Sequence, residues 1–147
     1  MKKPISILIT SISFFTFSCS PISSSSQSIV RIKNHDYDEI ITAKINYFDV
    51  FNQNEDEYFL YYFSETCYHC VGIKNEIIDF ALSSEVTVYF VEVEERFGVY
   101  DDVNKTVGTS NPLEAFANQT PQLSLVKDKE IYYSICGEDV ELFLFTK

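Results

Sequence analysis

The chain contains no tryptophan, one methionine, and only four glycines and four prolines among its 147 residues. So little glycine and proline excludes collagen-like repeats and Gly/Pro low-complexity segments. Basic residues are also scarce, with 11 Lys and Arg against 22 Asp and Glu. The formal net charge of −11 argues against a nucleic-acid partner, because such a surface repels phosphates. No apolar run approaches the roughly 20 residues that a membrane-spanning helix needs.

What is abundant indicates a folded domain. Hydrophobic residues make up 46% of the chain and aromatic residues 16%, which is enough to build a core. The length suits one domain, because single domains cluster near about 100–150 residues. We expect this domain to span residues 35–147 and to be a monomer. Four cysteines remain to be explained.

Residues 1–18 are typical of a secretory signal peptide. Two lysines precede an apolar stretch over residues 5–17, which is too short to span a bilayer and ends in small residues. The following Ser18-Cys19 resembles the lipobox of bacterial lipoproteins, in which the cysteine receives a diacylglyceryl group and becomes the mature N-terminus. Thr16 departs from the usual Leu three places before the cysteine. An ordinary signal peptide with an incidental Cys19 is the alternative.

The serine-rich residues 19–34 are expected to form a flexible tether, because this composition has no means of building a core. A lipidated Cys19 would anchor the exported domain to the outer face of the bacterial cytoplasmic membrane. The acidic domain would then be held close to the bilayer and repelled by its anionic head groups.

The hydrophobic pattern of the remaining chain predicts an α/β domain. A helical period covers residues 36–51, with Asp36 as N-cap and Glu39 in a capping box. The other predicted helices cover residues 67–82, 112–118 and 140–145. The predicted strands cover residues 58–63, 86–93, 123–126 and 131–136, and the last two form a hairpin through residues 127–130.

A Cys-x-x-Cys sequence, Cys67-Tyr68-His69-Cys70, follows the first strand and opens a helix. Two cysteines at this spacing in the first helical turn can close a disulfide with little backbone movement. Unpaired N–H groups and the helix dipole favour an anion at the first sulfur, which lowers its pKa. Cys67 is therefore the candidate nucleophile, and the more shielded Cys70 is the candidate resolving thiol.

Together with Thr120-Pro121 before the hairpin, this order of elements resembles the thioredoxin superfamily over roughly residues 36–147. The resemblance implies a thioredoxin-like sandwich with a central mixed four-stranded sheet flanked by helices. It implies a thiol–disulfide oxidoreductase that needs no cofactor. It also implies a cis Pro121, which places the Thr120 backbone beside the active sulfur, and a substrate-binding surface formed by Thr120, Pro121 and Tyr68.

His69, just before the second cysteine, resembles protein disulfide isomerase and the periplasmic disulfide oxidases, whereas thioredoxin itself has Pro there. An imidazole that stabilises the Cys67 thiolate favours the reduced form and makes the disulfide a better oxidant. An oxidase or isomerase bias is therefore expected. The expected partners are cysteine-containing exported proteins and a redox partner that resets the pair.

The sequence also departs from the thioredoxin pattern at three positions. Tyr61 stands where thioredoxin has a buried Asp, Phe90 stands where its partner Lys lies, and Thr66 replaces a Trp. The proton relay to the second thiol is therefore missing or built otherwise. We expect Tyr61 to be a core residue that could hydrogen-bond a nearby sulfur.

Three alternatives stay open at this stage. The domain could be a non-catalytic thioredoxin-like lipoprotein that serves as a binding module, the two cysteines could form a structural disulfide, or they could supply half of a zinc site. The remaining candidate zinc ligands are His35, His69 and Cys136, at unconvincing spacings, so no metal is expected. Cys136 is expected to be a small buried hydrophobe, and His35 a solvated neighbour of the helix cap.

Overall fold

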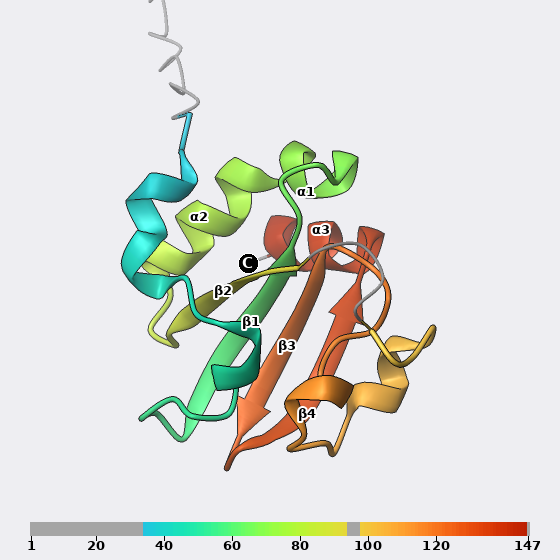
Figure 1. Cartoon of the computed structure of the whole chain (residues 1–147). Coiled ribbons are helices and arrows are strands. Elements are labelled where there is room, and N and C mark those ends of the chain that lie inside the picture. The colour runs from blue at the N-terminus through green and yellow to red at the C-terminus, as the bar shows by residue number, and fades with distance from the viewer. Residues whose placement is uncertain (1–33, 94–97, 147) are drawn as a thin grey trace, which may run out of the picture. The chain divides into compact units, whose positions relative to one another are not determined.

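Four apolar segments form the strands of one mixed sheet in the computed structural model, which describes residues 34–93 and 98–146. The strands are β1 (Glu57–Phe63), β2 (Val88–Glu92), β3 (Gln122–Lys127) and β4 (Glu130–Cys136), and they lie in the order β2-β1-β3-β4 (Figure 1). β1 pairs in parallel with β2 and antiparallel with β3, and β3 forms an antiparallel hairpin with β4. The predicted mixed sheet is confirmed.

The N-terminal predictions lie outside the described residues. They concern the signal peptide at residues 1–18, the lipidation of Cys19 and all but the last residue of the tether, and they stay predictions. Within the part of the chain that the structure describes, no helix combines the length and the hydropathy needed to cross a bilayer.

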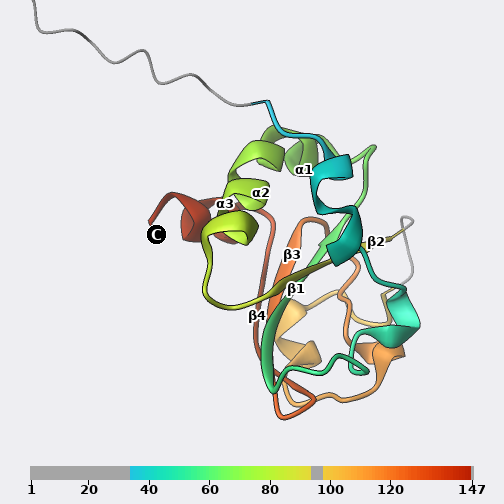
Figure 2. The ribbon, with the colours of Figure 1, turned by 90° about the vertical axis from the view of Figure 1, so that its left-hand side faces the viewer.

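Two layers of different character cover the sheet, as Figure 2 shows. The helical face is covered by α1 (Tyr68–Gly72), α2 (Lys74–Ser83) and α3 (Glu138–Phe145). The turn face is covered mainly by short 3-10 segments, which are η2 (Tyr47–Asp49), η3 (Val103–Thr106) and η4 (Pro112–Glu114). The sheet is therefore buried on both sides, as its apolar strands require.

β1 contributes to the core on both faces. Its side chains alternate, so Tyr61 and Phe63 join the buried cluster of the helical face, whereas Tyr58, Leu60 and Tyr62 join that of the turn face. All five are fully buried. An unbroken aromatic strand at the centre of the domain thus separates two cores, and each core meets a different set of loops.

The predicted helix over residues 36–51 is wrong beyond residue 43. A 3-10 helix, η1 (Tyr37–Ala43), ends where Lys44 pairs with Phe90 in the edge strand β2, and the Ile45 N–H donates to the Phe90 carbonyl at 2.9 Å. Backbone pairing to the sheet edge therefore overrides the helical pattern. The predicted capping box is confirmed: the Asp36 side chain accepts from the Glu39 backbone N–H, and the Asp36 N–H donates to the Glu39 carboxylate at 3.2 Å.

The predicted helix over residues 67–82 is divided in two. Ile73 adopts φ −107° and ψ 14°, outside the helical region, so α1 ends at Gly72 and α2 begins at Lys74. Ile73 itself is buried in the helical-face core, and this burial compensates for the break. Of the predicted helix over residues 112–118, only η4 forms, with the Asn111 side chain accepting the Leu113 N–H as a cap.

Candidate active site

Cys67 lies at the N-cap position of α1, where the chain leaves β1 and its short loop. Its sulfur accepts a hydrogen bond from the Cys70 backbone N–H at 3.3 Å, and its thiol donates to the Thr120 carbonyl at 3.4 Å. Two segments far apart in the sequence therefore meet at this sulfur. Cys67 and Cys70 are both free thiols in the structure.

The surroundings of Cys67 favour its thiolate. Partial burial raises the pKa of the Cys67 thiol, but hydrogen bonds from the Cys70 thiol, from Thr120 and from the backbone N–H groups of Cys70 and His69 outweigh burial. The net effect is a pKa below the ordinary value for cysteine. A partly exposed sulfur with a lowered pKa is the usual environment of a reactive cysteine.

Cys70 has the opposite environment. Its side chain is fully buried in the helical-face core, and burial is the main cause that raises the pKa of the Cys70 thiol to about 12. Its hydrogen bond with Cys67 raises the pKa further, because the pair shares one proton more easily than it loses both. The structure thus separates an accessible first thiol from a shielded, protonated second thiol.

The loop before β3 closes the site from the other side. The Thr120–Pro121 peptide bond is cis, and Thr120 presents its carbonyl to Cys67, which confirms the geometry expected for these residues. The Gly137 N–H donates to the Pro121 carbonyl at 2.8 Å and fixes this loop to the start of α3. The substrate-binding role of Thr120 and Pro121 stays a prediction.

The two residues between the cysteines face solvent. Tyr68 is 87% exposed, and its ring meets the His69 ring edge-on with centroids 5.7 Å apart. The contact that His69 makes with the Cys67 sulfur comes from its backbone N–H. An exposed aromatic residue beside this sulfur is available for contact with a partner, and the substrate-binding role of Tyr68 stays a prediction.

Gln122 is a site-supporting residue that the sequence analysis missed. Its buried side-chain amide accepts the Ala117 N–H at 2.8 Å and donates to the Ala115 carbonyl at 2.9 Å, and it also reaches Ser124 and Ser134. This amide holds the segment that leads into Thr120 and Pro121 against the turn face. The available signal was a glutamine directly after Pro121, at the start of an otherwise apolar strand.

Two side chains differ from their predicted environments. His35 is buried with only 2% exposed, and its ring nitrogens contact Glu39 Oε2 at 3.0 Å and Asp79 Oδ1 at 2.7 Å, so the solvated environment predicted for it is wrong. Cys136 is only partly buried, and its thiol donates to Gln119 Oε1 at 2.8 Å. Burial, followed by the nearby carboxylate of Asp139, raises the pKa of Cys136.

An aromatic cluster lies behind the two sulfurs. Tyr37 stacks on Phe63 with centroids 4.4 Å apart, and the rings of Tyr61 and Phe90 meet at 5.5 Å. Tyr61 and Phe90 occupy the positions at which the thioredoxin pattern has Asp and Lys. The prediction that Tyr61 is a core residue is confirmed.

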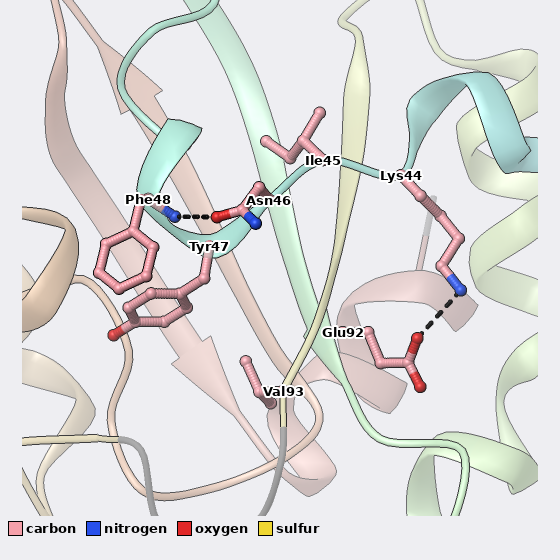
Figure 3. A pocket seen from close by; sticks show the side chains of 7 residues that line it. All are labelled: Lys44, Ile45, Asn46, Tyr47, Phe48, Glu92 and Val93. Carbon is pink, nitrogen blue, oxygen red and sulfur yellow. Dashed lines mark hydrogen bonds and ion pairs between the residues drawn. The ribbon is translucent and has the colours of Figure 1, made fainter.

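A pocket of about 370 Å³ lies beside this cluster, between residues 44–48 and the end of β2 (Figure 3). Lys44 forms an ion pair with Glu92 at 3.1 Å across it, and the Lys44 ammonium lies 5.6 Å from the centroid of the Phe63 ring. The pocket therefore adjoins the aromatic cluster, although its lining residues include neither cysteine of the pair. Among residues 34–93 and 98–146, no group of three His, Cys, Asp or Glu side chains is arranged to hold a metal ion.

Comparison with solved structures gives the fold family. A thioredoxin-fold protein proposed to be an oxidoreductase matches with a TM-score of 0.50 at 16% identity, covering 76% of this chain and 96% of that one. Thioredoxin f2 of Chlamydomonas reinhardtii matches with a TM-score of 0.47 at 10% identity, covering 70% and 90%. Oxidized mitochondrial thioredoxin 3 of Saccharomyces cerevisiae matches with a TM-score of 0.43 at 18% identity, covering 71% and 93%. The chain has a thioredoxin-like fold.

Comparison by sequence adds nothing to this result. No protein-family profile matches the chain, and no curated protein matches it. The resemblance to the thioredoxin superfamily therefore rests on the fold, on the spacing of the two cysteines and on the cis peptide bond that faces them.

Proposed function

We propose that this protein is an exported thiol–disulfide oxidoreductase, tethered to the membrane, that acts on cysteine-containing exported proteins. The observation that carries the proposal is the asymmetry of the Cys67 and Cys70 thiols. The pKa of Cys67 is lowered at a partly exposed sulfur, whereas that of the buried Cys70 is raised to about 12. A pair that differs in this way separates the roles of attacking and resolving thiol.

The proposed reaction is a two-electron exchange of disulfides. In the oxidising direction, a client thiolate attacks Cys67 in the Cys67–Cys70 disulfide, a client–Cys67 bond forms, and Cys70 leaves with the electron pair and takes up a proton. A second client thiolate then attacks the client sulfur of this mixed disulfide, and Cys67 leaves as a thiolate. The client is oxidised, and a redox partner with a disulfide of its own takes up the two electrons and resets the pair.

The direction of exchange is proposed from His69. In addition to the backbone N–H contact, which any residue would supply, we propose that the His69 imidazole donates to the Cys67 thiolate, which stabilises the reduced form and raises the reduction potential, as in an oxidase or isomerase. Redox titration against glutathione should therefore give a potential above thioredoxin's own value of about −270 mV. A potential at or below that value would assign the protein to the reducing direction.

Trapping in the native host tests the enzymatic role. The Cys70→Ala variant should retain mixed disulfides between Cys67 and client proteins, because the thiol that releases them is absent. Cys136→Ala is the matched control and should retain none. If the Cys70→Ala trap stays empty and the purified protein neither oxidises nor reduces thiol substrates, the domain is a binding module.

The membrane tether is proposed from the sequence of residues 1–34. Labelling cells with radioactive palmitate should mark the wild-type protein and leave Cys19→Ala unlabelled. Equal labelling of the two proteins would contradict the lipidation of Cys19, while the predicted export signal and the redox proposal would be unaffected.

A further inference from the structure

Tyr61 presents a buried hydroxyl to the helical-face core beside Cys70. Its side chain is fully buried in the centre of β1, and it belongs to the same buried cluster as Cys70. Among the described residues, the Tyr61 hydroxyl has no partner in a well-aligned hydrogen bond. A buried hydroxyl without a well-aligned partner destabilises the folded state, so its retention at the centre of β1 needs a reason.

We propose that the Tyr61 hydroxyl donates a hydrogen bond to the Cys70 sulfur when that sulfur carries negative charge. This inference rests on the redox role proposed above and deepens it. It assigns to Tyr61 a share in stabilising the second thiolate, alongside the backbone of Ser64 and the side chain of Thr120, whose hydrogen bonds also lower the pKa of Cys70. The contact between the Tyr61 hydroxyl and the Cys70 sulfur would then strengthen in the charged state.

The surroundings of Tyr61 support a donor and exclude a base. Burial, the charge of Cys70, the neighbouring Tyr37 and a hydrogen bond with Cys70 together raise the pKa of Tyr61 far above its ordinary value. Tyr61 therefore keeps its proton at every physiological pH. A hydroxyl that cannot ionise stabilises an adjacent thiolate by hydrogen bonding, but it cannot take the proton from the Cys70 thiol.

Few other groups compete for this role. From η1, the buried Tyr37 hydroxyl also interacts with Cys70, but it is influenced by Glu65, Cys67 and Glu92 as well. From the start of α1, Cys67 shares the proton of the pair. The other elements of the cluster contribute apolar side chains, namely Ile77 from α2, Phe90 from β2, Leu123 from β3 and Val140 from α3.

The assigned step is the same in both directions of exchange. When a client disulfide is reduced, the Cys70 thiol loses its proton to solvent, its sulfur attacks Cys67 in the mixed disulfide, the Cys67–Cys70 bond forms, and the client leaves as a thiolate that takes up a proton. When a client is oxidised, Cys70 is the leaving thiolate. In each case charge develops on Cys70, and Tyr61 stabilises it.

The test uses an aromatic disulfide, DTNB, as the client, with the full chain carrying Cys19→Ala and Cys136→Ala so that Cys67 and Cys70 are the only thiols. Reduced protein should release one thionitrobenzoate when Cys67 attacks the reagent. It should release a second when Cys70 attacks Cys67 and closes the disulfide. The two phases separate the chemistry of the first thiol from that of the second.

Tyr61→Phe should slow the second phase about tenfold, because it removes one hydrogen bond to a charged sulfur. It should shift the pH dependence of that phase to higher pH and leave the rate of the first phase within twofold. Tyr62→Phe is the matched control. It removes another buried, unpartnered hydroxyl from the next residue of β1, but on the turn face, and it should change neither phase by more than twofold.

The parent protein is the chain that carries only Cys19→Ala and Cys136→Ala. The inference would be overturned if the second-phase rate of Tyr61→Phe stayed within twofold of the parent's rate, or if Tyr62→Phe slowed that phase equally. In those outcomes the parent still releases two equivalents of thionitrobenzoate, so the redox proposal stands. If the parent releases only one equivalent, Cys70 does not resolve the mixed disulfide, and both proposals fail together. Circular dichroism melting curves of both variants verify that the measured rates belong to folded protein.

Discussion

The two faces of the sheet treat buried polar groups in opposite ways. On the turn face, the Gln122 amide bonds to the backbone of residues 115 and 117 and to two buried serines, so its hydrogen-bonding capacity is used within the resting structure. On the helical face, the Cys70 thiol and the Tyr61 hydroxyl are buried among apolar side chains, and the hydroxyl has no well-aligned partner among the described residues.

This difference shows that buried polar groups can have two roles. Groups with all their hydrogen bonds made can hold a loop in place, and a hydroxyl without a partner can be available for the reaction. The satisfied network of the turn face fixes the position of the loop that carries Thr120 and Pro121. On the helical face, by the proposal above, the Tyr61 hydroxyl is stabilised when charge appears on the Cys70 sulfur. An unpartnered hydroxyl alone does not mark a site, since Tyr62 on the turn face has one too. The group beside the hydroxyl distinguishes the two tyrosines, because Tyr61 interacts with the Cys70 thiol whereas Tyr62 interacts with the tyrosines Tyr47 and Tyr58.

The largest expected effect is the difference in reactivity between the thiols on the helical face. Because the pKa of Cys67 is lowered and that of Cys70 is raised to about 12, the thiolate population at neutral pH is far larger at Cys67 than at Cys70. Reduced protein treated with iodoacetamide at pH 7 should therefore be alkylated first at Cys67, then at Cys136, and last at Cys70. Peptide mass spectrometry over time gives the order.

The pH dependence of that alkylation has a definite sign. The rate at Cys67 should reach half its maximum below pH 9.0, whereas the rate at Cys70 should still be rising at pH 11, because the folded protein holds that proton until about pH 12. Unfolding in urea should erase the difference. Equal rates at the two cysteines in the folded state would remove the asymmetry on which the proposed function depends.

The next largest effect is expected on stability, when the hydrogen-bond network of the turn face is broken. Gln122→Leu leaves the buried Ala117 N–H and Ala115 carbonyl without their partner, and we expect a loss of about 3 kcal/mol in the free energy of unfolding. Gln119→Leu is the matched control, because Gln119 is an exposed amide of the same loop whose hydrogen bond from the Cys136 thiol is also exposed, and it should change stability by less than about 0.5 kcal/mol. Urea unfolding curves compare the two.

If Gln122→Leu and Gln119→Leu unfold at the same urea concentration, the network on the turn face is not what fixes the loop. If Gln122→Leu is destabilised as expected, its folded form should also have a displaced Thr120 carbonyl. The pH at which Cys67 is half-alkylated would then move, although Gln122 does not touch the sulfur.

The sequence predicted the sheet and the placement of the Cys67–Cys70 pair well because their signals are local. A run of six apolar and aromatic residues at 58–63 requires cover on both faces, and a Cys-x-x-Cys at a helix start places the two thiols at different depths. The hairpin through residues 127–130 was predicted for the same reason, and its two central residues, Asp128 and Lys129, take the positive φ values of a tight turn.

The failures of prediction come from contacts between distant segments. The helical period of residues 36–51 is real, but pairing of Lys44 with Phe90 ends the helix, and that contact joins positions far apart in the chain. His35 was predicted to be solvated because its partner Asp79 lies on α2, 44 residues later. Gln122 was missed because only the folded loop brings the backbone of residues 115–117 to its amide.

A smaller effect is expected where the two carboxylates meet His35. His35→Gln should cost about 1–2 kcal/mol, because both ring nitrogens lose their carboxylate contacts. The cost is moderate because Asp79 is 66% exposed and Glu39 is 38% exposed, so both carboxylates regain water. His69→Gln, at an exposed position, is the control for urea unfolding. A loss equal to that of Gln122→Leu would mean that His35 anchors the whole helical face.

The smallest effect is the most direct comparison of the two faces. Tyr61→Phe and Tyr62→Phe each remove a buried hydroxyl without a well-aligned partner and keep the ring, so each should leave the reduced protein as stable as wild type or more stable by up to about 1 kcal/mol. Thermal unfolding of the two variants should therefore give similar shifts of the melting temperature, in the same direction.

Of these two variants, only Tyr61→Phe should lose activity, because Tyr61 lies beside a sulfur that becomes charged and Tyr62 does not. A hydroxyl whose removal leaves stability unchanged or improved while slowing the chemistry is kept for the reaction. If Tyr61→Phe instead destabilises the protein by more than about 1 kcal/mol, the hydroxyl is part of the packing of the helical face. The two faces would then differ in which residues they bury, and the Tyr61 hydroxyl would have no separate role in the reaction.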